Sequence, residues 1–447
     1  MSDTLTFLET FKTRDAKRSP EPSWVAARRQ AGAARFEAMG FPTRRDEEWK
    51  YTNVRGIAQG HFALADNGHF SPAAAAALTL PVDAYRLTFV DGVFAAALSD
   101  VQDLPQGVEV LPLSQALEDN HEAVGGPLGR LTGVEFSAFS ALNTAFMEEG
   151  AVVRLAAGCV VEKPIVLQFL SRENAEPTMC HPRVLVEAAG RSEATLVEHH
   201  AGDAEAKNFT NIASELFLGR GAILTHYKLQ EAPLGDYHVA SIHVEQQRDS
   251  RYVSHNLDLG GALVRNDLIS DLNGKGAEAT FNGLFFGQGR QHVDNHTKVN
   301  HNAPLTFSNE NYKGILDDRA HGVFNGRVYV KRDSQQIEGF QSNQNLLLSD
   351  RAHIDAKPEL EIYADDVKCS HGTTTGQLDE DAVFALRSRG LDEQTARGLL
   401  TLAFAGEVLE EVALDAIAER VELAVAGKLP ERFNLVGLVE ASSALGD

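Results

Sequence analysis

The chain has 447 residues, 43% of them hydrophobic, and a formal net charge of −22 at pH 7. This length can bury a large core and exceeds one typical domain. The acidic excess argues against nucleic acid or an anionic membrane as a partner, because both would repel the chain. Residues 1–30 lack the apolar core of a secretory signal and no run of about 18 apolar residues follows, so we expect a cytoplasmic protein.

The three cysteines, Cys159, Cys180 and Cys369, are widely spaced and form no Cys-x-x-Cys pair. Their odd number and their spacing exclude a disulfide framework and a zinc site built from cysteines alone. A reducing compartment fits this pattern.

Residues 1–80 have the composition of helices. The segment SWVAARRQAGAARFEAMG begins at a candidate capping residue, Ser23, contains strong helix formers and ends at Gly40, shortly before Pro42. An irregular connection, DEEWKYTN, follows. We therefore predict an N-terminal helical domain over residues 1–80.

A β pattern begins near Asp83. Short runs of β-branched and aromatic residues recur at about ten-residue spacing, with Gly, Asn or Asp between them. Examples are RLTFV, KPIVLQFL, PRVLVEA, EATLVEHH, HVASIHVE and GRVYV. We predict a mainly β core domain over residues 81–378, interrupted by local helices such as Ala141–Glu149.

This region contains weak internal repeats. A Gly-basic turn precedes a strand in GRSEATL at Gly190, GRGAIL at Gly219 and GKGAEATF at Gly274, and DRAH occurs at Asp318 and again 32 residues later at Asp350. Such repeats favour a solenoid, whose coils bury their apolar faces against neighbouring coils. A β-sandwich explains the strand spacing equally well, and short turns of this kind can recur by chance. Both architectures stay open at this point.

Helical composition returns after Gly376. The segment LDEDAVFALRSRG predicts a helix capped by Asp379, with Val383, Phe384 and Leu386 directed inward.

Two further helices are predicted, one starting at Asp392 and one over Asp415–Ala426. Together they define a C-terminal helical domain over residues 379–447. Helices at both ends of the chain could cover the open edges of a stacked β unit.

Common catalytic signatures are missing from the sequence. No GxxxxGK[ST] phosphate loop, GxGxxG fingerprint, HExxH motif or GxSxG nucleophile elbow occurs. We therefore expect that the chain does not hydrolyse ATP.

The histidine-rich segment QHVDNHTKVNHN is a first candidate site. If it is a strand, His292, Asp294 and His296 share one face, where they could bind a metal. A polar ladder on a solvated strand face explains the same pattern. The sequence assigns no role to these histidines or to His301.

The segment VKCSHGTTTG is a second candidate. In an extended strand Cys369 and His371 share one face and Ser370 lies on the other. A thiolate and an imidazole suit iron or zinc, but such sites usually take about four protein ligands. Either Cys369 is a small buried hydrophobic residue, or the pair is half of a site that another chain completes.

The segment KPELEIYADDVKCSHGTTTGQLDEDAVFALRSRGL, residues 357–391, resembles the most characteristic stretch of the SufB/SufD family of the Suf iron–sulfur cluster assembly machinery. PTRRDEEWKYTNV, HVDNHTKVNHNAP, GVFNGRVYV and SNQNLLLS extend the resemblance over nearly the whole chain. CSHGTTTG stands where SufB-type members usually carry an EATTSKI-like segment, which favours the SufD branch. Thr373 replaces an alanine that is common there, and an extended strand accommodates this change.

The resemblance implies a right-handed parallel β-helix core flanked by N-terminal and C-terminal helical domains. It also implies a non-catalytic scaffold subunit of a SufBCD complex, which pairs with SufB and binds the SufC ATPase through the C-terminal helices. Cys369 and His371 would then be candidate ligands of an iron–sulfur cluster formed transiently at the SufB interface, with no ATP bound by this chain.

A homodimer of the isolated chain is a further expectation. The alternatives are a SufB-type paralogue or, in another class, a β-helix carbohydrate-active enzyme.

Overall fold

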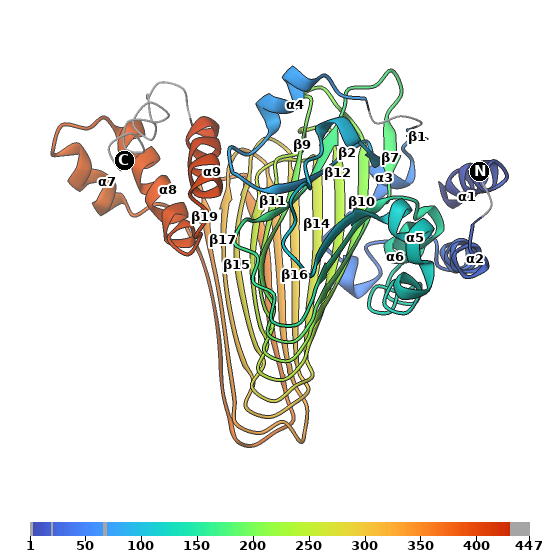
Figure 1. Cartoon of the computed structure of the whole chain (residues 1–447). Coiled ribbons are helices and arrows are strands. Elements are labelled where there is room, and N and C mark those ends of the chain that lie inside the picture. Colours follow the sequence, from blue (N-terminus) through green and yellow to red (C-terminus); the bar gives the residue numbers. More distant parts are fainter. Residues whose placement is uncertain (1–2, 19–20, 66–68, 430–447) are drawn as a thin grey trace.

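The computed structural model describes residues 3–18, 21–65 and 69–429. Its body is a parallel β-solenoid with helices on either side (Figure 1). The helices are α1 Asp3–Asp15, α2 Ser23–Met39, α3 Arg55–Ala58, α4 Pro72–Leu78, α5 Leu113–Gly125, α6 Ala138–Phe146, α7 Glu380–Arg387, α8 Glu393–Leu409 and α9 Asp415–Lys428, with short 3-10 turns η1 Glu47–Trp49 and η2 Ala96–Leu98.

The strands are β1 Ala63–Leu64, β2 Tyr85–Val90, β3 Val93–Phe94, β4 Val108–Pro112, β5 Gly150–Leu155, β6 Ile165–Ser171, β7 Thr178–Cys180, β8 Arg183–Ala188, β9 Glu193–Gly202, β10 Phe209–Leu218, β11 Ile223–Gln230, β12 Tyr237–Gln246, β13 Arg251–Asp258, β14 Leu263–Leu272, β15 Glu278–Gly287, β16 His292–His301, β17 Phe307–Leu316, β18 His321–Val330, β19 Ile337–Leu347, β20 His353–Ile362 and β21 Val367–Gly376.

Two sheets form the walls of the solenoid. Sheet A has the order β20-β18-β16-β14-β12-β10-β8-β5-β4, and sheet B has the order β21-β19-β17-β15-β13-β11-β9-β6-β2-β3. From β8 onward the long strands alternate between the sheets, so each coil contributes one long strand to each wall. This arrangement confirms the predicted β-solenoid and decides against the β-sandwich.

The two ends of the stack differ. At the N-terminal end both sheets finish with an antiparallel strand, since β3 pairs with β2 and β4 pairs with β5. At the C-terminal end the last strands, β20 and β21, run parallel to β18 and β19. The reversed strands end the coil pattern at one end, whereas the other end keeps the geometry to which a further coil could be added.

The repeated Gly-basic motifs lie at one corner of successive coils, and the nested turns are visible in Figure 1. One residue of each corner has a left-handed backbone; these residues include Arg191 (φ 60°), Gly221 (66°), Asp249 (56°), Gly276 (72°) and Leu305 (60°). Glycine adopts this conformation without steric cost at Gly221 and Gly276. The motif glycines before them are needed for close packing instead, since a Cβ would lie 2.8 Å from Gly190 N at Gly219 and 1.9 Å from Arg248 N at Gly274. Hydrogen bonds between adjacent corners, such as that from Arg191 N to Arg220 O at 2.9 Å, hold the stack together.

The DRAH repeat is also a coil repeat. Its two histidines, His321 and His353, are the first residues of β18 and β20 and are register partners.

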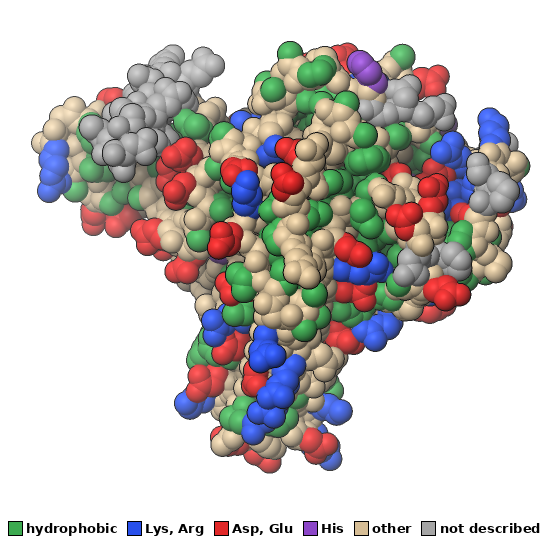
Figure 2. Space-filling view, in the orientation of Figure 1, with side chains coloured by type: hydrophobic (Ala, Val, Ile, Leu, Met, Phe, Trp, Pro, Cys, Tyr) green, Lys and Arg blue, Asp and Glu red, His purple; other side chains and the backbone are tan. Residues whose placement is uncertain are grey.

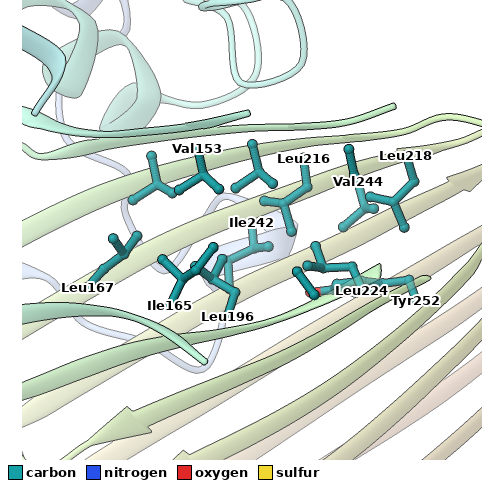
Figure 3. Packing of buried hydrophobic residues seen from close by; sticks show 14 of the residues in the cluster. Val153, Ile165, Leu167, Leu196, Leu216, Leu218, Leu224, Ile242, Val244 and Tyr252 are labelled. Carbon is teal, nitrogen blue, oxygen red and sulfur yellow. The ribbon is translucent and has the colours of Figure 1, made fainter. Parts of the chain in front are cut away.

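The space between the sheets contains the main hydrophobic core. Alternate side chains point inward, as the strand period requires. Leu167 and Leu196 of sheet B meet Leu216 and Ile242 of sheet A there, as Figure 3 illustrates. All four are buried.

The helices cover the outer faces of the sheets. The N-terminal helices lie on sheet A, where Phe36 and Phe139 share a cluster with Phe209. The C-terminal helices lie on sheet B, where Val408 and Val421 share a cluster that includes Leu257 and Ile315. In Figure 1 the two helical groups therefore stand on opposite sides of the solenoid. No helix in the described ranges is long and apolar enough to cross a membrane.

Two predicted helix starts were displaced. The predicted helix Ala141–Glu149 begins earlier, at Ala138, because the Ser137 side chain accepts a hydrogen bond from Ser140 N, and it ends at Phe146. Ser23 is the first helical residue rather than the cap, and extended Pro22 precedes it.

The C-terminal helices confirm the predicted cap at Asp379 and the predicted helix start at Asp392. The Asp379 side chain accepts from Asp381 N, and the Asp392 side chain caps α8 in the same way. The predicted inward direction of Phe384 was wrong, since it is 70% exposed while Val383 is buried. Helix α7 packs on α8 along one face only. Because consecutive residues lie about 100° apart around a helix, burial of Val383 on that face turns Phe384 toward solvent. The part of the predicted C-terminal domain beyond residue 429 lies outside the described residues.

Acidic and basic side chains are interspersed on the face seen in Figure 2.

Candidate functional site

The predicted pair, Cys369 and His371, lies on β21, the last strand of sheet B. Their register partners in β19 are Gly339 and Gln341, which are buried on the interior side of that strand. The strand period therefore places Cys369 and His371 on the interior-facing side of sheet B and Ser370 on the outer side.

Strands β20 and β21 form an open end of the solenoid. In the described part of the chain, β20 pairs with β18 and β21 with β19, and neither has a partner at its other edge. Every residue from Ser370 to Gly376 is exposed. The end of the stack thus presents unpaired backbone groups, which can accept another strand.

The Cys369 thiol lies in a half-buried apolar environment. It packs against a small cluster that includes Val328, Val330 and Ile337. A Cβ added at Gly339 would lie 3.3 Å from Sγ, so glycine leaves room for the sulfur. Burial raises the pKa of the Cys369 thiol, although a backbone hydrogen bond at Gly339 opposes the rise. In the isolated chain the thiol form is favoured, and a metal would have to displace its proton.

The pair by itself is an incomplete ligand set. Residues two apart on a strand are separated by about 6.6 Å along the strand, so both side chains would have to lean toward a common ion. Among the described residues, no group of three His, Cys, Asp or Glu ligand atoms within 4.8 Å of one another includes Cys369 or His371. Iron–sulfur and structural zinc sites need more ligands than these two.

The other candidate, His292, Asp294 and His296, does share one face of β16, as predicted. This face is the outer side of sheet A, and the N-terminal segment covers it. Asp294 accepts a hydrogen bond from Arg265 Nη1 at 2.6 Å and another from Thr52 Oγ1.

Both histidines of this group have protein partners. His292 Nε2 lies 2.7 Å from Thr52 Oγ1, and His296 Nε2 lies 3.1 Å from Asp294 Oδ1. His296 Nδ1 lies 3.4 Å from Glu48 Oε2.

These contacts set the charges of the group. Burial would raise the pKa of Asp294, but Arg265 and His296 outweigh it and lower that pKa strongly. Burial lowers the pKa of His292 to about 4, whereas Asp294 and Glu48 raise the pKa of His296 against burial and Arg265. The group is an ion-paired clamp between the N-terminal segment and the solenoid. The predicted solvated polar ladder was wrong, because the N-terminal segment covers this face and buries Asp294 and His296.

His301 is an interior residue. Its ring lies 2.7 Å from Thr306 Oγ1 and 2.9 Å from Ser308 Oγ, and burial lowers its pKa to about 4. It therefore bridges a strand and the following turn as a neutral ring.

Sequence reasoning missed the partners of this clamp. Trp49 packs under the Arg265 guanidinium, with 4.5 Å from Cζ to the ring centroid, and Glu48 O accepts from Arg265 Nη1 at 2.9 Å. The acidic, aromatic segment DEEWKYTN was the available signal, since it supplies both a carboxylate and a cation-binding ring. Its docking position more than 200 residues away could not be deduced from the local pattern.

Comparison with known proteins places this architecture in a family. Residues 169–404 match the family model described as SUF system FeS cluster assembly, SufBD core domain. Residues 1–167 match the model described as SufBD protein N-terminal region.

Individual relatives agree with these matches. The chain is 34% identical over 427 residues to a SufBD family iron–sulfur cluster assembly protein of Synechocystis sp., covering 94% of each chain. It is 32% identical over 423 residues to the iron–sulfur cluster assembly protein SufD of Escherichia coli, covering 94% of this chain and 95% of that one. A chloroplastic protein of Arabidopsis thaliana is 28% identical over 401 residues, 88% of this chain and 84% of its own length. The chain belongs to the SufBD family of iron–sulfur cluster assembly proteins.

Proposed function

We propose that this chain is a non-catalytic scaffold subunit, which pairs with a SufB-like chain and holds part of the site where an iron–sulfur cluster forms. The observation that carries the proposal is the open C-terminal end of the solenoid, where β20 and β21 each have one unpaired edge in the described structure. A second β-solenoid subunit could dock there by parallel or antiparallel strand addition.

The ligand chemistry at this end supports the proposal. Cys369 and His371 lie on the terminal strand, with the imidazole exposed and the thiol half-buried. A docking chain would come within reach of both side chains and could supply the missing ligands. The cluster is cargo that forms transiently between the two subunits, and Cys369 and His371 are this chain's contribution to it.

The C-terminal helices are the proposed contact for a SufC-like ATPase. Phe384 of α7 is 70% exposed, an unusual position for a large apolar side chain. The opposite faces of α8 and α9 are already used on sheet B, where Val408 and Val421 pack. The proposed binding surface for the SufC-like subunit is therefore α7 together with the outward surface of α8.

This packing decides how the contact should be tested. Truncation after Gly376 would uncover apolar residues of sheet B, including Leu257, Leu284 and Ile315, and would destabilise the core. Phe384→Ala avoids this problem because the side chain is exposed. We expect it to weaken copurification of the SufC-like subunit at least tenfold while the SufB-like subunit is retained; unchanged recovery of the SufC-like subunit would place the contact elsewhere.

In this proposal the SufC-like subunit, and not this chain, binds and hydrolyses ATP. The chain lacks a phosphate-binding loop motif. We expect isothermal titration of the isolated chain with ATP and magnesium to give no micromolar site, and such a site would refute the assignment. A cytoplasmic location belongs to the same proposal.

Co-expression with genes for SufB-like and SufC-like chains, followed by anaerobic purification, tests the assembly as a whole. We expect SufB-like and SufC-like chains to copurify in a complex that binds iron and sulfide. A chain that purifies alone and cleaves polysaccharide would instead support the carbohydrate-active alternative. The 32% identity to a protein named SufD over nearly the full length argues for the SufD-type subunit over a SufB-type paralogue.

A further inference from the structure

A second group of possible metal ligands lies away from Cys369 and His371. His321 begins β18, and His353 begins β20, its neighbour in sheet A. Asp355 lies two residues after His353 on the same strand, so the three side chains lie on one face of sheet A. This is the outer face, which in the preceding coil carries His292 and the clamp described above.

The three side chains converge on a small volume. Asp355 Oδ2 lies 2.8 Å from His321 Nε2 and 3.3 Å from His353 Nε2. One ligand atom from each residue lies within 4.8 Å of the other two. Ligands bound at about 2.0–2.2 Å to a common ion lie roughly 3–4 Å apart, so small rotamer adjustments would let all three reach one ion.

The types of ligand define the class of ion. Two imidazoles and one carboxylate suit divalent first-row transition metals such as Fe²⁺, Co²⁺ and Zn²⁺, whereas Mg²⁺ and Ca²⁺ prefer oxygen ligands. Two histidines and a carboxylate on one side of an ion leave its remaining positions open to water.

The equivalent side chains of the preceding coil are occupied by other partners, whereas His321, His353 and Asp355 contact one another. There, Asp294 is neutralised by Arg265 and His292 is hydrogen-bonded to Thr52. Asp355, in contrast, has no Arg or Lys partner within the described ranges, and its ion-pair partners there are the two histidines themselves.

Solvent reaches the later coil as well. The side chain of His353 is 64% exposed, and those of His321 and Asp355 are 28% and 25% exposed. An ion could therefore enter without rearrangement of the sheet.

We propose that His321, His353 and Asp355 form a binding site for one divalent transition-metal ion on the outer face of sheet A. The site is separate from Cys369 and His371, which lie on sheet B. The repeated DRAH segment was the signal for it in the sequence, since its histidines are one coil apart.

The full chain, without a histidine tag and stripped of metal by a chelator, is titrated with Co²⁺ by calorimetry and visible absorption. We expect one ion per wild-type chain, with ligand-field bands in the visible spectrum. His353→Ala and Asp355→Asn should each weaken binding at least tenfold and remove these bands. His353 is mostly exposed, so the variant should fold normally, which circular dichroism would check.

Two matched controls separate this site from other histidines. His243→Ala removes a histidine that lies 2.8 Å from Asp271 but belongs to no group of three ligands among the described residues. His371→Ala removes the candidate cluster ligand. Both variants should bind Co²⁺ like the wild type.

Two results would overturn the proposal. One is the absence of Co²⁺ binding by the wild type, and the other is equal affinity in the wild type and in His353→Ala. If His371→Ala alone lost the ion, the metal would belong to the cluster site instead. Competition with Fe²⁺ under anaerobic conditions and with Zn²⁺ then ranks the ions of this class.

Discussion

The early and late coils of the solenoid share one strand register but have different interiors. In the early coils, aliphatic side chains such as Val153, Leu167, Leu196 and Leu216 meet between the sheets (Figure 3). In the later coils, amides and carboxylates occupy many equivalent positions. Asn256 and Asn295 hydrogen-bond across the interior, whereas the pairs Asn266–Asn295 and Gln341–Glu310 each join neighbouring strands of one sheet.

The aliphatic interior of the early coils contributes mainly to stability, whereas the polar interior of the later coils contributes mainly to a unique strand register. Aliphatic burial contributes about 25 cal/mol per Å² and tolerates small shifts of neighbours. Buried amides must find partners, and Asn295 Oδ1 accepts from both Asn256 Nδ2 and Asn266 Nδ2 at 2.9 Å. A shift in register would leave these groups unpaired. The later coils therefore hold the register that leads to the open end, where His371 and Thr373 lie on the interior-facing side of the terminal strand β21.

The largest expected effect is in an early coil. Leu196 is 1% exposed in the main core, and Leu196→Ala should lower the free energy of unfolding by about 2–5 kcal/mol, because it removes buried methyl groups and leaves a cavity. Urea denaturation measures this loss. Val160→Ala is the control, since Val160 is 57% exposed and its truncation should cost less than about 0.5 kcal/mol. Equal losses in the two variants would contradict the assignment of the core.

A pH effect is expected in a late coil. Burial raises the pKa of Glu310 from 4.5 to about 7, against hydrogen bonds from Thr297 and Gln341. Because the folded state binds the proton more tightly than the unfolded state, the stabilisation is complete below pH 4.5 and is lost as the pH rises to 7. The loss amounts to roughly 2–4 kcal/mol.

Glu310→Gln isolates this effect, because glutamine keeps the shape of the protonated acid without titrating. The difference in unfolding free energy between the wild type and Glu310→Gln should change by that amount between pH 5 and pH 7.5. A difference that stays constant over this range would mean that Glu310 is ionised in the fold.

A smaller effect is expected for the amide network. Asn295→Ala should lower the free energy of unfolding by about 1–3 kcal/mol, because Asn256 Nδ2 and Asn266 Nδ2 each lose one of two acceptors and keep only Asp258 Oδ2. Denaturant unfolding measures the loss. A double substitution in which Asn256 also becomes alanine should cost less than the sum of the two single losses, since the two residues share a hydrogen bond. Additive losses would show that the network is not coupled.

Much of the fold could be predicted from the sequence. Strand period, the spacing of the runs and the Gly-basic turns predicted a mainly β core, since these signals are local, but they left a solenoid and a β-sandwich open. The resemblance to the SufB/SufD family was needed to choose the solenoid. The cap at Asp379 and the helix start at Asp392 were correct because a capping side chain acts within three residues. The direction of Phe384 was wrong because a helix that packs along one narrow face exposes residues that an apolar pattern assigns to the core.

The sites were less accessible to sequence reasoning. Sequence proximity alone identified the pair Cys369 and His371, and the strand period placed both on one face. The partners of Asp294, by contrast, come from Arg265 and Thr52, and only the docking of the N-terminal segment unites them. Register between coils likewise decides which histidines meet, and register is a property of the whole stack.

The central claim is that the terminal strand contributes to a cluster site shared with a partner chain. The most direct measurement is the iron and acid-labile sulfide content of the anaerobically purified complex with wild type, His371→Ala or Thr373→Ala, with size-exclusion chromatography to confirm assembly. Thr373 is exposed on the same face of β21, two residues beyond His371, and is the matched control. We expect all three complexes to assemble and only His371→Ala to lose most of its iron and sulfide. Equal cluster content in the wild type and His371→Ala would contradict the claim.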